Sequence, residues 1–140
     1  MKSVCLIGYG TWGKKIFKSL KQIKSIKHIQ LIKNRKDKNK INLKNLDWVI
    51  IATNTQSHYR IVKKYLKKKI NVFCEKPLTS NIKKNIELYD LANKNKSKLY
   101  VSDIENYKRI RIKLNNINYI FRSKLSENKD AIVERLAYHD

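Results

Sequence analysis

The sequence predicts an α/β fold: a doubly wound, mostly parallel sheet with helices on both faces. Three features predict it. Short apolar runs alternate with longer amphipathic segments over residues 2–104, which is the pattern of βαβ units. The run 47–52 is apolar after its first residue, as expected of a parallel strand that is buried on both faces. The run 2–7 stops at a glycine-rich turn that opens a helix. Because βαβ crossovers are right-handed, such units wind around one sheet.

Five strands and three helices are expected in this part of the chain. The strands are 2–7, 28–32, 47–52, 70–74 and 99–104, and the helices are 12–24, 56–68 and 81–95. Apolar residues at helical spacing predict which face of each helix turns toward the sheet. These residues are Ile16, Leu20 and Ile23 in the first helix, Ile61, Val62, Tyr65 and Leu66 in the second, and Ile82, Ile86 and Tyr89 in the third. The polar tract that follows the second strand is too short for a full helix.

Composition narrows the classes of partner. The chain has 140 residues, a formal charge of +22 and a pI near 10.1. Such a charge suits nucleic acid or an anionic surface, but lysine greatly outnumbers arginine, the residue that base readout and phosphate clamping favour. Nucleic-acid binding is therefore disfavoured. No apolar stretch approaches the roughly 20 residues that span a bilayer, and the chain starts with a strand rather than a signal peptide. We expect a cytoplasmic protein without membrane association.

The two cysteines are expected to be core residues. Cys5 and Cys74 each lie inside a predicted buried strand. Neither has ligand spacing with another cysteine or with a histidine. We therefore expect reduced, buried thiols and no metal site.

A glycine motif follows the first strand directly. It has the form G-x-G-x-x-G and opens a helix, as dinucleotide binding requires. Gly8 would permit the tight turn, Gly10 would let a pyrophosphate approach the backbone, and Gly13 would let helix and strand pack closely. These are the chain's three glycines. The segment predicted to hold the dinucleotide is Gly8, Tyr9, Gly10, Thr11, Trp12 and Gly13.

The end of the second strand bears on the choice of cofactor. An NAD-preferring site usually has an acid about 20 residues after the glycines, which holds the ribose 2′-hydroxyl. This chain instead offers a basic tract that contains Asn34 and Arg35. An arginine fork and a neutral amide can accept a 2′-phosphate, so NADP(H) is favoured and NAD(H) stays an alternative.

The loop after the third strand should also line the cofactor, because ligands of open α/β sheets bind at the carboxyl ends of the strands. Its residues are Ala52, Thr53, Asn54 and Thr55. His58 falls in the first turn of the next helix. It either contacts the ribose or substrate, or it is a local hydrogen-bonding residue.

The fourth strand ends in Glu75-Lys76-Pro77. A lysine fixed at a strand end, beside the place for a nicotinamide ring, can polarise a carbonyl or hold an alkoxide during hydride transfer. The alternative is a surface ion pair before a proline that stops the strand.

The glycine motif, the loop 52–55 with His58, and above all Glu75-Lys76-Pro77 resemble the Gfo/Idh/MocA family of oxidoreductases that handle sugars. The resemblance implies a Rossmann-type domain and NAD(P)-dependent oxidation or reduction of a sugar, cyclitol or polyol. It implies that Glu75 lies near the nicotinamide ribose and Lys76 at the reacting oxygen.

The resemblance also implies a second domain. Residues 1–107 match the cofactor domain, whereas 108–140, with a strand at 117–121 and a helix at 130–138, match only the truncated start of an α+β domain for substrate binding and oligomerisation. His139 would be the substrate-site histidine, or else a polar residue near a frayed terminus. Arg135 stands where the family often has an aspartate.

Three hypotheses follow. The first is an NAD(P)-dependent oxidoreductase acting on a sugar or polyol, in surface-polysaccharide precursor metabolism for example, with Lys76 and His139 as catalytic residues. The second is a non-catalytic module that binds a dinucleotide or docks on a partner, as a homo-oligomer or with a complementing chain. The third is a basic nucleic-acid binder.

Overall fold

The computed structural model describes residues 1–34, 37 and 41–102, and within them the chain alternates between strand and helix. The expected strands and helices are confirmed, with bounds that differ by no more than two residues wherever the structure describes them. The elements are β1 (Lys2–Ile7), α1 (Thr11–Gln22), β2 (Ile26–Ile32), β3 (Trp48–Ile51), α2 (Thr55–Leu66), β4 (Asn71–Glu75), α3 (Ile82–Lys94) and β5 (Leu99–Ser102). The strand 117–121, the helix 130–138 and the domain boundary after residue 107 lie outside the described residues and stay predictions.

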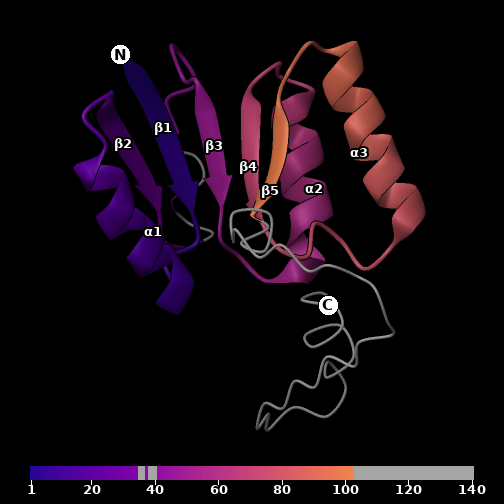
Figure 1. The fold of residues 1–140 in the computed structure, drawn as a ribbon, viewed down its shortest axis with the longest axis horizontal. Helices are drawn as coiled ribbons and strands as arrows, with labels where there is room; N and C mark the ends of the chain where they lie inside the picture. The colour runs from indigo at the N-terminus through magenta and orange to yellow at the C-terminus, as the bar shows by residue number, and fades with distance from the viewer. Residues whose placement is uncertain (35–36, 38–40, 103–140) are drawn as a thin grey trace, which may run out of the picture. The chain divides into compact units, whose positions relative to one another are not determined.

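The strands form one parallel sheet in the order β2-β1-β3-β4-β5 (Figure 1). From β1 the chain first moves to one side, to β2, and then crosses to the other side, to β3. The strand order therefore reverses between β1 and β3, and in open parallel sheets that switch point is where ligands bind, at the carboxyl ends. The predicted doubly wound fold is confirmed.

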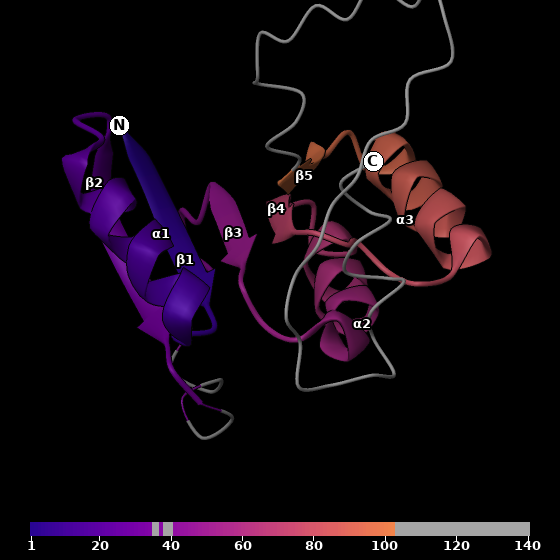
Figure 2. The same cartoon turned by 60° about the horizontal axis from the view of Figure 1, so that its bottom comes forward.

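Alternate residues of β1, β3 and β4 enter two separate apolar clusters. Val4 and Leu6 of β1 pack with Leu20 of α1, whereas Cys5 and Ile7 belong to the cluster that includes α2 and α3. This two-residue period is what a strand covered on both faces requires. Figure 2 shows α1 alongside β1 and β2, and α2 and α3 beside β4 and β5.

Helix faces were predicted with unequal success. All four apolar residues predicted for α2 are buried. In α1, Leu20 is buried and Ile16 is half-buried, but Ile23 follows the last turn and is exposed. The prediction for α3 is wrong: Ile82, Ile86 and Tyr89 are 71%, 55% and 44% exposed.

Another stripe of α3 turns inward instead. Leu88 and Ala92 are its buried residues. The rotation of the helix is held at both ends, because Thr79 Oγ1 lies 2.7 Å from Asn85 Oδ1 and Asn95 Nδ2 donates to the Leu66 carbonyl at 2.8 Å. Ala92 is small enough to let α3 approach its neighbours closely. These tertiary contacts outweigh the larger apolar area of the stripe that the sequence favours.

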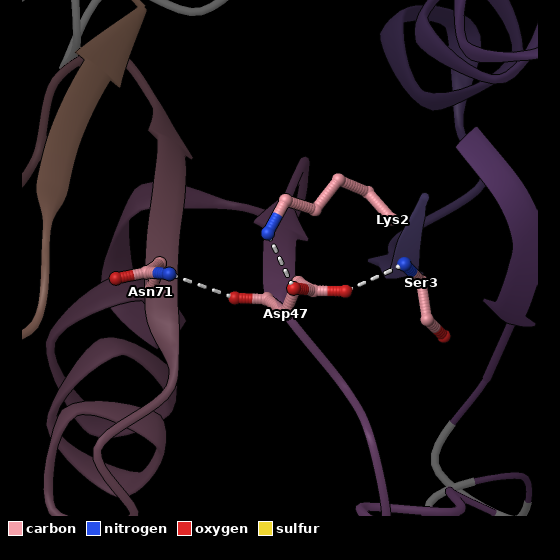
Figure 3. A network of polar contacts seen from close by, with 4 residues as sticks. All are labelled: Lys2, Ser3, Asp47 and Asn71. Atoms are coloured by element: carbon pink, nitrogen blue, oxygen red, sulfur yellow. Dashed lines mark hydrogen bonds and ion pairs between the residues drawn. The ribbon is translucent and has the colours of Figure 1, made fainter. Parts of the chain in front are cut away.

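The amino ends of the strands are tied together by Asp47 (Figure 3). Its carboxylate accepts hydrogen bonds from Lys2 Nζ and from the Ser3 backbone N–H, both at 2.8 Å. Asn71 Nδ2 donates to the Asp47 carbonyl at 3.0 Å, and Asn71 Oδ1 accepts from the Lys98 N–H at 2.9 Å. The network joins β1, β3 and β4 at the amino ends of these strands.

Both cysteines are buried and free, as expected of reduced core residues. Burial raises the pKa of Cys5 to about 11 and raises the pKa of Cys74 further still. Each thiol therefore stays protonated and behaves as a small apolar side chain. In the part of the chain that the structure describes, none of the helices combines the length and apolarity needed to cross a membrane.

Candidate functional site

Predicted site residues from four separate segments gather at the carboxyl edge of the sheet. The glycine loop follows β1, Asn34 follows β2, Ala52 to Thr55 follow β3, and Glu75 ends β4. Because the strands are parallel and adjacent, their carboxyl ends must lie at the same edge. The predicted site residues therefore share one edge of the sheet, and the Asp47 network lies at the opposite end of the strands.

The glycine loop is shaped by close backbone contacts. Gly8 has a φ of 102°, and a Cβ placed on it would lie 2.3 Å from the Ala52 carbonyl oxygen. A Cβ on Gly13 would lie 2.2 Å from the Gly8 carbonyl oxygen, so α1 packs directly on the turn. A Cβ on Gly10 would meet nothing within 4 Å. Two of the glycines are thus required by the fold, and the third leaves open space above the backbone.

The first turn of α1 suits an anionic group. Gly10 is its N-cap, no side chain caps the helix, and the first turn has no acidic residue. The first N–H groups of a helix have no partner within the helix, and the macrodipole makes that end positive. Together with the open space at Gly10, these features fit a dinucleotide pyrophosphate. Trp12 lies in this turn with about half of its surface exposed.

A cavity of about 200 Å³ lies beside the glycine loop. Four predicted residues line it: Gly8, Asn34, Thr53 and Asn54. It is also lined by Lys33, Ser57 and Arg60, so the first two turns of α2 form part of its wall. Ser57 Oγ donates to the Asn54 carbonyl at 2.8 Å and lies 2.7 Å from Thr53 Oγ1.

Sequence reasoning missed Arg60 as a residue of this site. A signal was available in the helical period, because Arg60 lies three residues after Ser57 and so shares its face of α2. The basic tract after β2 is the stronger local signal for a cation.

Sequence reasoning also missed an acid at the end of β2. Asp37 Oδ2 lies 3.3 Å from the backbone nitrogens of Lys33 and Asn34, which donate to it. The carboxylate thus folds back to the strand end from a position beyond the basic tract, where a linear count from the glycines does not find it. Arg35 lies outside the described residues, so its role stays a prediction.

His58 is buried, with 1% of its surface exposed. Its Nδ1 lies 2.9 Å from the Pro77 carbonyl oxygen and its Nε2 lies 3.0 Å from the Thr53 carbonyl oxygen. Both partners are acceptors, and a neutral imidazole has one N–H, so both contacts are hydrogen bonds only when the ring carries two protons. One contact is local in sequence and the other spans 19 residues, and a contact of His58 with ribose or substrate stays a prediction. His58 connects the loop after β3 to the segment after β4.

Glu75 is the last residue of β4, and Glu75, Lys76 and Pro77 are all half-buried. Glu75 pairs in register with Ser102 of β5, and the Lys76–Pro77 peptide bond is cis. The three residues are not among those that line the cavity near Arg60. His139 lies outside the described residues, so the predicted pair of Lys76 and His139 stays a prediction.

Comparison with solved structures gives the same fold. An NAD-binding oxidoreductase from Klebsiella pneumoniae is 18% identical with a TM-score of 0.65, and the match covers 74% of this chain and 35% of that one. A biliverdin reductase from a Synechocystis species, solved with biliverdin and NADP+, is 18% identical with a TM-score of 0.65 over 75% and 39%. A proposed myo-inositol dehydrogenase from Sinorhizobium meliloti is 16% identical with a TM-score of 0.66 over 78% and 38%.

The chain thus spans well under half the length of these structures, and at such identities the likeness concerns the fold. No curated protein matches the sequence. The model of the oxidoreductase family with an NAD-binding Rossmann fold, Gfo/Idh/MocA, matches residues 19–103. The doubly wound sheet and the uncapped N-terminus of α1 are consistent with that match. The chain therefore belongs to the Gfo/Idh/MocA oxidoreductase family through its NAD-binding Rossmann domain.

Proposed function

We propose that this chain binds NADP(H) and takes part in hydride transfer at a CH–OH group of a sugar, cyclitol or similar polyol. The observation that carries the proposal is the His58 contact with Pro77, which ties the residue next to Lys76 to the loop after β3. The lysine is thereby held at the same sheet edge as the glycine loop. A lysine at such a strand end suits proton exchange better than a surface ion pair, because its backbone is fixed from both sides.

Different residues bind the coenzyme and transfer the proton in this proposal. The N–H groups at the start of α1 and the open space at Gly10 bind the pyrophosphate, and Thr53 and Asn54 line the path of the cofactor. When bound, the nicotinamide supplies the hydride donor or acceptor. Lys76 then takes the proton from the substrate hydroxyl in oxidation and returns it in reduction. Glu75, one residue earlier, orients the nicotinamide ribose.

NADP(H) is preferred in this proposal because cations flank the adenosine side of the site. Lys33 and Arg60 line the cavity, and the Lys33 ammonium lies 5.4 Å from the centre of the Tyr9 ring in the glycine loop. Asp37 opposes the preference, since a carboxylate at the end of β2 repels a 2′-phosphate. Its position against two backbone N–H groups partly balances its charge.

Cofactor binding is tested by fluorescence. Trp12 is half exposed in the first turn of α1, so NADPH or NADH bound at the glycine loop should quench it. The variant Trp48→Phe keeps Trp12 as the reporter, because Trp48 stacks on Tyr100 on the sheet. If neither coenzyme changes the emission of Trp12 and calorimetry detects no heat of binding, the proposed function fails.

Catalysis is tested separately with a panel of inositols and hexoses. Lys76→Met should lower kcat by about 100-fold or more with little change in coenzyme affinity, because a positioned acid–base group contributes on that scale. Lys83→Met removes a charge from an exposed position on α3 and is the matched control. Coenzyme binding without turnover on any polyol would leave a dinucleotide-binding module and remove the hydride-transfer proposal.

A further inference from the structure

We infer that Arg60, on the second turn of α2, is the residue that selects NADP(H) by binding its 2′-phosphate. The inference rests on the proposed function and adds a residue that lies far along the chain from the end of β2. It assigns to the cavity beside the glycine loop the adenosine 2′-phosphate as its ligand group.

The cavity lies where the adenosine ribose of a bound dinucleotide would extend. Its walls come from the carboxyl ends of β1 and β2 and from the first turns of α2. When a pyrophosphate lies at the start of α1, the adenosine ribose extends toward the end of β2. The 2′-oxygen of a ribose placed there would come to the end of β2, where Lys33, Ser57 and Arg60 line the cavity.

The guanidinium of Arg60 has no carboxylate partner among the described residues. Within residues 1–34, 37 and 41–102, no carboxylate forms an ion pair with its guanidinium. Its charge is therefore available to a ligand. A guanidinium offers two parallel N–H donors that match a phosphate, and Ser57, one turn earlier, adds a hydroxyl to the same wall.

The negative charge of Asp37, which would repel a 2′-phosphate, lies outside the cavity lining. Asp37 is the carboxylate that the structure places at the end of β2, and the Lys33 and Asn34 backbone N–H groups donate to it. It is not among the residues that line the cavity. Among the residues that the structure describes, the cavity lining includes the cations Lys33 and Arg60 and no acid, so it favours a dianionic phosphate over a ribose hydroxyl.

The test uses fragments of the coenzyme and the full chain. Adenosine 2′,5′-bisphosphate and adenosine 3′,5′-bisphosphate carry the same charge, so the pair separates a built site from general attraction to a chain of charge +22. Calorimetry at low ionic strength should give at least about 10-fold tighter binding of the 2′,5′ isomer. Arg60→Gln should weaken that isomer by about 10- to 100-fold and leave adenosine 5′-monophosphate within about threefold.

Two further variants sharpen the result. Lys64→Gln removes the same charge from an exposed position one turn further along α2, outside the cavity lining, and should change each affinity by less than about threefold. Arg60→Lys keeps the charge without the fork and should fall between wild type and Arg60→Gln. Arg60 is exposed, so thermal unfolding should show that its variants fold.

The outcomes are distinguishable. Equal binding of the two bisphosphates, or equal losses in Arg60→Gln and Lys64→Gln, would overturn the role of Arg60 while coenzyme binding itself stood. A wild-type chain that binds no nucleotide, NADP(H) and NAD(H) included, would overturn the proposed function and this inference with it. Loss of 2′,5′ discrimination in Arg60→Gln alone would support the inference.

Discussion

The two ends of the parallel strands differ in how their polar groups are satisfied. At the amino end, Asp47 accepts hydrogen bonds from Lys2 and Ser3, and Asn71 accepts one from Lys98 and donates one to the Asp47 carbonyl. At the carboxyl end, the first turn of α1 has no side-chain cap and Arg60 lines a cavity. One end of the sheet uses its polar groups to join strands, and the other leaves the first N–H groups of α1 and the Arg60 guanidinium available to a ligand.

This difference has a physical cause. A parallel sheet brings the loops before the helices to its carboxyl edge, so helix N-termini and their N–H groups gather there. Donors that are already paired would gain little by binding an anion, because the pairs would first have to break. Some polar groups at this end are nevertheless paired within the protein: both ring nitrogens of His58 contact backbone carbonyls, and Ser57 bonds to Thr53 and Asn54. Stability and ligand binding should therefore respond differently to changes at the two ends.

The largest effect should come from Gly13→Ala. The added Cβ would lie 2.2 Å from the Gly8 carbonyl oxygen, so α1 must shift, and we expect a loss of more than about 3 kcal/mol in the free energy of unfolding. Gly10→Ala is the matched control, because its Cβ meets nothing within 4 Å. It should keep its stability in urea unfolding but lose coenzyme affinity. Equal stability of the two variants would contradict this description of the loop.

His58→Ala should come next, with a loss of about 2 to 3 kcal/mol, because it removes a buried ring and leaves the Thr53 and Pro77 carbonyls without that partner. The same variant should weaken coenzyme binding, since Thr53 lines the cavity. His28→Ala changes an exposed histidine on β2 and serves as the control in chemical denaturation. If His58→Ala were as stable as His28→Ala, the link between the two loops would be unimportant.

Asp47→Asn should cost about 1 kcal/mol near neutral pH and leave coenzyme affinity unchanged. Hydrogen bonds from Lys2 and from the Ser3 N–H hold the pKa of Asp47 below its ordinary value of 3.8. A carboxyl group whose pKa is lower in the folded state stabilises that state at a pH above its ordinary pKa. That stabilisation is lost as the pH falls through the pKa of the folded state. The wild-type chain should therefore lose its advantage over Asp47→Asn below about pH 4, as measured by urea unfolding across pH. A difference that did not depend on pH would argue against the ion pair and the backbone bond.

Lys2→Met should have the smallest effect, below about 0.5 kcal/mol. The Lys2 side chain is 57% exposed, so water and salt screen its pair with Asp47. The Ser3 N–H remains to hold the carboxylate. Urea unfolding at low and high salt should show little change in the difference between Lys2→Met and wild type. A larger loss than that of Asp47→Asn would show that the ion pair, rather than the backbone bond, ties this end.

Local patterns in the sequence were sufficient for most of the fold. The apolar run before Gly8 predicts β1, and the stripe that includes Val62 and Leu66 predicts the buried face of α2, because each pattern repeats with the period of its own element. The glycine motif and the loop after β3 were also found correctly as parts of one edge, since parallel strands end side by side. The roles of Lys76 in chemistry and of His139 beyond the described residues stay predictions.

The sequence by itself determined the order of strands and helices, the glycine turn and the edge of the sheet at which the predicted site residues gather, because these follow from contacts between near neighbours in the chain. Only the tertiary structure decided which stripe of α3 is buried, that His58 joins two loops, and that Asp37 and Arg60 come to the end of β2. The Asp37 contacts span only three and four residues. The buried stripe of α3, the His58 link and the place of Arg60 depend on groups that are distant in sequence, such as Asn95 with Leu66. The local periodicity of apolar residues cannot specify which distant residue a side chain contacts.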